Sequence, residues 1–128
     1  MKQQRIKLIL LSLMLTMFSA CSKSKKTDAL PPEIFLDTPT ENQVFANGDN
    51  VSIKGSARSS TTIALMHVHI SNNSTGELLV DIHRYPDASL YVIDESFLAT
   101  SGTTYKIQLL VTDKFANETR LTRIVSCP

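Results

Sequence analysis

Residues 102–113 read GTTYKIQLLVTD, a run in which apolar and polar side chains alternate. A period of two places successive side chains on opposite faces of a β-strand, so one face is apolar and the other is polar. The apolar positions are Tyr105, Ile107, Leu109 and Val111. The run follows a glycine and ends in the turn-forming group DKFAN of residues 113–117. We therefore predict a half-buried strand here.

Similar runs repeat along the rest of the chain, separated by turn residues such as those at 47–50 and 71–76. Their apolar positions are Ile34 and Leu36; Val51 and Ile53; Ala64, Met66, Val68 and Ile70; Leu78, Val80 and Ile82; and Leu90 to Ile93. A last run extends from Thr119 to Val125. About seven short strands with a turn every 8–12 residues are typical of an antiparallel β-sandwich. The sequence predicts an all-β fold, with one sandwich over residues 33–128.

Two segments resemble bacterial Ig-like domains. Residues 32–55, with Pro32-x-Ile34-x-Leu36 and Gly48-Asp49-x-Val51-x-Ile53-x-Gly55, are similar to the opening of such domains. Residues 102–117 are similar to their penultimate strand and last hairpin. The resemblance implies a single antiparallel Ig-like β-sandwich of the immunoglobulin and fibronectin III type over residues 31–125.

The same resemblance assigns structural roles to three residues. It places Tyr105 at a tyrosine corner, where the hydroxyl bonds back to nearby backbone. Asp113 and Asn117 fall in the last hairpin. The family usually has glycine before that asparagine, whereas this chain has Ala116.

The first twenty residues have a different composition. The segment from Leu8 to Phe18 is apolar except for Ser12 and Thr16, and only basic charges precede it. As a helix, eleven residues rise about 16 Å, roughly half of the ~30 Å hydrocarbon core of a bilayer. We therefore predict a secretory signal peptide over residues 1–20 rather than a transmembrane span.

Residues 18–21, Phe-Ser-Ala-Cys, resemble the lipobox of bacterial lipoproteins, although that family prefers leucine where Phe18 stands. The resemblance implies that the Cys21 thiolate receives a diacylglyceryl group and that the chain is cut just before it. The new amino group would then be acylated, with palmitate as an expected acyl chain. The alternatives are a secreted protein cut after Ala20 and a signal anchor with an incidental cysteine.

We expect residues 21–32 to comprise the lipidated cysteine and a flexible tether, since the segment is polar from Ser22 to Asp28 and ends in two prolines. Two or three acyl chains give firm anchoring in membrane lipid. By the sorting rule of enterobacterial lipoproteins, Ser22 implies delivery to the outer membrane of a Gram-negative cell. A lipobox followed by one Ig-like domain is similar to small lipoproteins of Bacteroidetes.

Charge and composition exclude several functions. From residue 30 onward the chain has seven basic and eleven acidic residues, a formal charge of −4. An acidic domain has no electrostatic attraction for nucleic acid. The chain has no nucleophile elbow, no glycine-rich phosphate loop and no tryptophan. We expect a non-enzymatic, membrane-tethered module of the cell envelope, without a cofactor apart from its lipid, that binds an envelope protein or has a structural role.

The three histidines suggest an alternative, a zinc or copper site. His67 and His69 lie on one strand face, and a hairpin centred near Ser74 would place His67 across from Asp81, with His83 diagonal to it. This arrangement resembles the zinc site of α-carbonic anhydrases. The four residues would be the metal ligands. A one-residue slip would turn His83 toward the core, and a polar strand face without metal is the other interpretation.

Cys127 lacks an intrachain partner once Cys21 carries lipid. It would pair with another molecule, remain a free thiol, or pack at a strand end against the sandwich.

Overall fold

The computed structural model describes residues 29–128, which contain six strands and no helix. The strands are β1 (Glu33–Thr38), β2 (Asn50–Asn72), β3 (Leu78–Arg84), β4 (Ala88–Leu98), β5 (Thr103–Asp113) and β6 (Glu118–Cys127). Within this part of the chain, no helix has the length and apolar character needed to cross a bilayer. The predicted signal peptide, Cys21 and the tether up to residue 28 lie outside the described residues.

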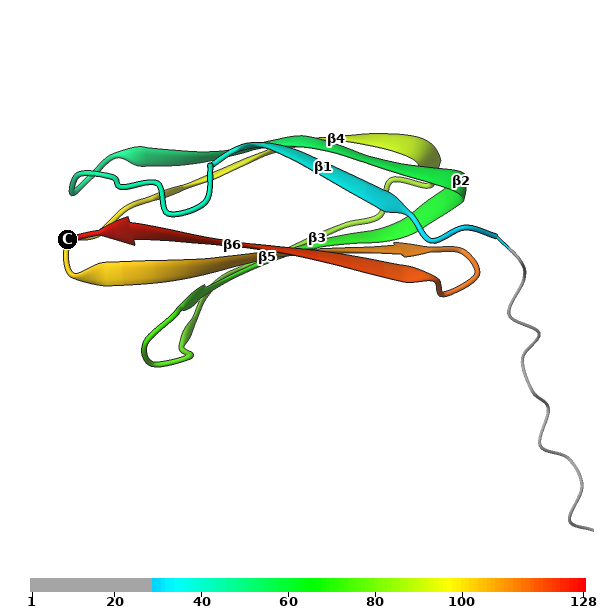
Figure 1. The fold of residues 1–128 in the computed structure, drawn as a ribbon. Helices are drawn as coiled ribbons and strands as arrows, with labels where there is room; N and C mark the ends of the chain where they lie inside the picture. Colours follow the sequence, from blue (N-terminus) through cyan, green and yellow to red (C-terminus); the bar gives the residue numbers. More distant parts are fainter. Residues whose placement is uncertain (1–28) are drawn as a thin grey trace, which may run out of the picture.

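The long strand β2 joins the two layers of the molecule (Figure 1). Residues 50–58 pair antiparallel with β1 and with β4. Residues 63–72 pair antiparallel with β3 and β5, and β5 pairs with β6. One layer is therefore β1–β2–β4 and the other is β3–β2–β5–β6. Because the two halves of β2 serve different layers, the six strands supply the seven paired segments that the sequence pattern predicts.

The change of layer occurs at the polar run of residues 59–62, Ser-Ser-Thr-Thr. The pairing of β2 with β4 is irregular between Arg58 and Ile63, on either side of this run. The Ser59 hydroxyl accepts a hydrogen bond from the Thr61 N–H at 3.1 Å. Such local side-chain to backbone bonds replace ladder bonds where a strand bends.

The core lies between the two layers and follows the predicted alternation. Tyr105, Ile107, Leu109 and Val111 are all buried. The other buried apolar side chains are Val51, Ile53, Ala57, Ile63, Met66, Val68, Ile70, Ile93, Ala99, Val125 and Cys127. In the structure Cys127 is buried at the end of β6 and its thiol is free, so two of the predicted alternatives are both observed.

Two predicted core positions are wrong, each because of an irregularity in the strand pairing. The register of β2 against β5 shifts between Ile63 and Leu65, so Ile63 is buried while Ala64 is exposed. The register of β2 against β3 shifts next to Ser71, and Leu78 is exposed. A bulge reverses the alternation on one side of itself, which a simple period of two does not reproduce.

Two side chains tie the ends of β5 to neighbouring turns. The Tyr105 hydroxyl accepts a hydrogen bond from the Thr100 N–H at 2.7 Å. The Asp113 carboxylate, almost fully buried, accepts bonds from the backbone N–H groups of Phe115 and Asn117 and from the Asn117 amide, each at 2.9 Å. Ala116 has φ = 64°, in the left-handed region that glycine adopts without strain.

The last residues of the predicted tether lie against the β5–β6 turn. The Thr119 hydroxyl donates a hydrogen bond to the Pro32 carbonyl at 2.5 Å. The Asn117 amide donates to the Ala29 carbonyl at 3.4 Å. The chain therefore enters the domain at the end of the sandwich where this turn lies (Figure 1).

Candidate metal centre

The β2–β3 hairpin places all four predicted ligands on the outer face of its layer. His67 lies directly across from His83, and His69 lies across from Asp81. The predicted opposition of His67 and Asp81 is therefore wrong by two residues. A shift by an even number of residues keeps every side chain on its own face, so the core remains apolar and the polar groups stay together.

Three of the four side chains converge. The Nε2 atom of His67 contacts Oδ1 of Asp81, and Nε2 of His83 lies 3.3 Å from the same oxygen. One ligand atom from each residue lies within 4.8 Å of the other two. The rings of His67 and His83 stack with their centroids 4.2 Å apart. Imidazole nitrogen and carboxylate oxygen are ligands of Zn²⁺, and imidazole also suits Cu²⁺.

His69 lies beside this cluster rather than in it. Its ring stacks on His67 with centroids 5.7 Å apart, but it does not belong to the converging group. His67 reaches Asp81 across the ladder, whereas His69 lines a hollow together with Gln108 and Leu110 of β5. Of the four residues predicted as ligands, the structure therefore brings three together, His67, Asp81 and His83.

The electrostatics of the cluster favour an ionised Asp81. Its hydrogen bond with His67 is the main cause that lowers the pKa of the Asp81 carboxyl below its usual value. Partial burial acts in the opposite direction, and the hydrogen bond with His83 adds to the lowering. The side chains of Asp81 and His83 are each 43% exposed, so a metal ion would reach them directly from solvent.

A hollow lies on the same face of the layer, bounded by the histidines of β2 and by residues of β5 and β6. It is lined by His67, His69, Gln108, Leu110 and Arg120. Arg120 is paired with Glu118 at 3.2 Å. Among these lining residues His69 is the one potential ligand besides His67, and it lies outside the converging group, so the hollow does not enlarge the cluster.

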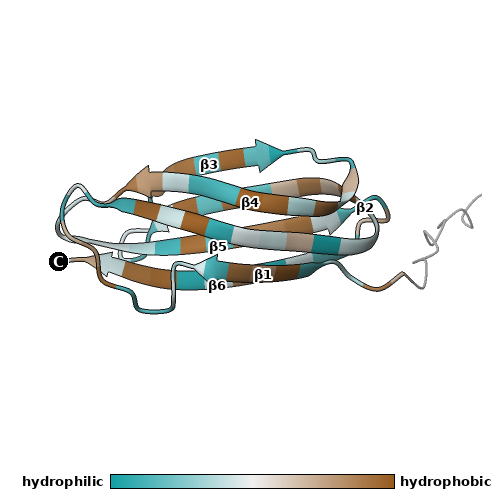
Figure 2. Cartoon of the chain, turned by 90° about the horizontal axis from the view of Figure 1, so that it is seen from above, coloured by the Kyte–Doolittle hydropathy of each residue, from teal (hydrophilic) through white to brown (hydrophobic). Residues whose placement is uncertain are grey.

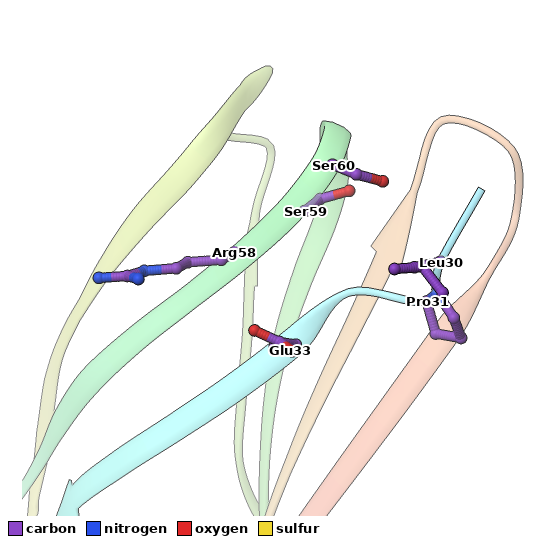
Figure 3. A pocket seen from close by; sticks show the side chains of 6 residues that line it. All are labelled: Leu30, Pro31, Glu33, Arg58, Ser59 and Ser60. Carbon is purple, nitrogen blue, oxygen red and sulfur yellow. The ribbon is translucent and has the colours of Figure 1, made fainter.

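A second hollow lies where the chain enters the domain (Figure 3). Its six lining residues are Leu30, Pro31, Glu33, Arg58, Ser59 and Ser60. Figure 3 shows the Arg58 side chain extending away from the hydroxyl groups of Ser59 and Ser60. Because its polar groups do not converge, this hollow is a weaker candidate site.

A salt bridge that the sequence did not predict connects β3 with β4. The Nε and Nη2 atoms of Arg84 donate to the two Glu95 oxygens at 2.9 and 3.1 Å. The bridge joins β3 of one layer to β4 of the other, and the hydrogen bond to Glu95 raises the pKa of Arg84. Only the strand register brings these two residues together.

Comparison with known proteins identifies the fold. The structure is similar to the fibronectin(III)-like modules of Clostridium thermocellum CbhA, with a TM-score of 0.53 and 17% sequence identity. That match covers 77% of this chain and 47% of the other, so the chain spans about half of its length. A superoxide reductase (neelaredoxin) from Ignicoccus hospitalis is also similar, with a TM-score of 0.53, 7% identity and coverage of 80% and 84%.

No family model and no curated protein sequence matches the chain. At these identities the structural likeness concerns the fold alone. The described residues have an antiparallel Ig-like fold, similar to that of fibronectin(III)-like modules, as the sequence resemblance implied.

Proposed function

We propose that this protein is a membrane-tethered, non-enzymatic Ig-like lipoprotein of the cell envelope that acts as a binding or structural module. The observation that carries the proposal is the combination of the lipobox at residues 18–21 with a single sandwich domain. Acyl chains on Cys21 would hold the domain at a membrane surface, and its loops and strand edges would meet an envelope protein. The expected location is the outer membrane.

Replacing Cys21 by serine is expected to release the protein from the membrane fraction, because serine has no thiolate to accept the lipid. Fractionation of cells expressing the full chain, with metabolic labelling by a palmitate analogue, measures the change. Cys127→Ser is the matched control, since that thiol is buried within the sandwich and should leave labelling unchanged. Equal membrane retention and labelling of Cys21→Ser would contradict the proposed anchor.

A second function is favoured by the convergence of His67, Asp81 and His83. We propose that these three residues bind Zn²⁺ or Cu²⁺ on the outer face of the β3–β2–β5–β6 layer. Their ligand atoms already lie within 4.8 Å of one another, so little rearrangement is needed. Two strands joined by ladder hydrogen bonds hold the three side chains, which limits the entropy lost on binding.

Titration of the purified full chain with Zn²⁺ in a calorimeter is expected to show one site with a Kd tighter than about 10 μM, or about −7 kcal/mol. His67→Ala should weaken binding about 100-fold, equivalent to about 2.7 kcal/mol. His69→Ala is the matched control and should bind zinc nearly as the parent does, because His69 lies outside the cluster. Equal losses in the two variants, or no binding by the parent, would remove this function.

A further inference from the structure

Strand β3 forms one edge of its layer. Among residues 29–128 its only pairing partner is β2, and Figure 2 shows β3 at the margin of the molecule. Its outer face carries Leu79, Asp81 and His83, and Tyr85 continues the same alternation just past the strand end. Leu79 and Tyr85 are 42% and 74% exposed. An edge strand presents unpaired backbone groups that can pair with another strand.

The order of side chains along β3 is complementary to itself. If two copies pair antiparallel about Ile82, His83 of each copy lies opposite Asp81 of the other. The same register sets Leu79 opposite Tyr85. Residues directly opposite have Cβ atoms about 4.5–5.5 Å apart, where ionic and aromatic–aliphatic pairs stabilise a sheet. Pairing about Asp81 instead would oppose two carboxylates, which is unfavourable.

The metal cluster also lacks one ligand. Zn²⁺ in structural sites takes four protein ligands, whereas His67, Asp81 and His83 supply three. Both histidines contact the same carboxylate oxygen, Oδ1 of Asp81. Its Oδ2 atom is therefore the one that can turn toward a second copy, whose His83 would lie opposite Asp81.

We propose that two copies of this chain pair antiparallel through their β3 edges about Ile82, and that zinc bound in each copy takes its fourth ligand from Asp81 of the other. This inference rests on the proposed zinc site. The partner is a second copy because a single register places His83 opposite Asp81 and Leu79 opposite Tyr85. The same register brings Asp81 of one copy to the zinc site of the other, where the fourth ligand is missing.

Disulfide trapping tests this register in the full chain. Chains carrying Leu79→Cys and chains carrying Tyr85→Cys, each with a different tag, are mixed and oxidised with diamide in the presence of Zn²⁺ or EDTA. Opposite residues in an antiparallel pair have Cα atoms about 4.5–5.5 Å apart, within the range that a disulfide spans. We expect a disulfide-linked heterodimer with Zn²⁺ and its loss in EDTA. Leu79→Cys alone should not cross-link, since its two copies would be far apart along the edge.

The remaining outcomes of the trapping and calorimetry experiments separate the β3 pairing from the zinc site. Adding His67→Ala to both chains should abolish the heterodimer, and its persistence would show that the new thiols themselves bind zinc and would overturn the inference. No heterodimer despite calorimetric zinc binding, or equal yields in Zn²⁺ and EDTA, also overturns it while leaving the zinc site intact. If calorimetry shows no zinc binding, both the site and the inference fail.

Discussion

Replacing Asp113 by alanine is expected to lower the free energy of unfolding by about 4 kcal/mol. The substitution removes the acceptor for the backbone N–H groups of Phe115 and Asn117 and for the Asn117 amide. These donors lie beside a nearly fully buried carboxylate, so they would lose their partner without full access to water. The turn between β5 and β6 would open, together with the contacts of Ala29 and Pro32 that lie against it.

Urea unfolding followed by circular dichroism measures this change. Asp87→Ala is the matched control, because Asp87 is an exposed turn aspartate that does not contribute to the core, and alanine at its φ of 48° costs only about 1 kcal/mol. A loss for Asp113→Ala no greater than that for Asp87→Ala would show that the buried carboxylate does not organise the turn.

Lowering the pH should remove the contribution of the Asp113 carboxylate to the stability of the parent protein. Burial alone would raise the pKa of Asp113, but the hydrogen bonds from Asn117, Phe115 and Thr61 outweigh it and hold this pKa below its usual value. A carboxyl with a depressed native pKa stabilises the fold above its unfolded pKa of about 3.9 and loses that contribution as the pH falls through the native value. Asp113→Asn lacks this contribution.

The difference in unfolding free energy between the parent and Asp113→Asn should therefore be constant above about pH 4 and shrink below it. Urea titrations across that window, with both proteins at each pH, provide the measurement. A difference that grows as the pH falls would have the wrong sign and would contradict the assigned role.

Replacing Gly55 by alanine is expected to destabilise the domain by about 3 kcal/mol. Gly55 pairs with Leu36 of β1, and a Cβ atom there would overlap the carbonyl oxygen of Phe35 and lie 3.0 Å from the Leu36 Cα atom. These neighbours are backbone atoms, so they can move only if β1 shifts as a whole. Leu36 would then lose its packing against the core.

Gly76→Ala is the matched control for this substitution. Gly76 has φ = 77° with open space around its Cα, so alanine there adds conformational strain of about 1 kcal/mol but no overlap. Urea unfolding should rank Gly55→Ala as the more destabilised variant, and amide exchange should increase in β1. The reverse ranking would mean that β1 adapts to the added methyl group.

The fold class was predictable because the hydrophobic pattern of each strand is local. The alternation from Tyr105 to Val111 indicates a strand with one buried face, whatever its partners are. Repeated runs bounded by turn residues then restrict the architecture to a sandwich. The long β2 was predicted as two strands because its polar centre interrupts the apolar pattern, although the backbone continues through it.

The candidate metal site was only partly predictable. The shared face of His67, His69, Asp81 and His83 follows from the period of two alone. Which of them converge depends on the register of the β2–β3 hairpin and on how each side chain leans across the pleat. The turn residues did not fix the centre of the hairpin to within one residue. Moving the centre by one residue moves each opposing partner by two positions, so His83 rather than Asp81 lies opposite His67.

The sequence by itself determined the buried face of most strands and the turn positions, because these depend on neighbouring residues; the lipid anchor at Cys21 stays a prediction. Only the tertiary structure decided the bulges that expose Ala64 and Leu78, the Arg84–Glu95 bridge and the separation of His69 from the cluster of His67, Asp81 and His83. Such features arise from contacts between residues distant in the chain. Their geometry is set by packing and strand register, which no local pattern specifies.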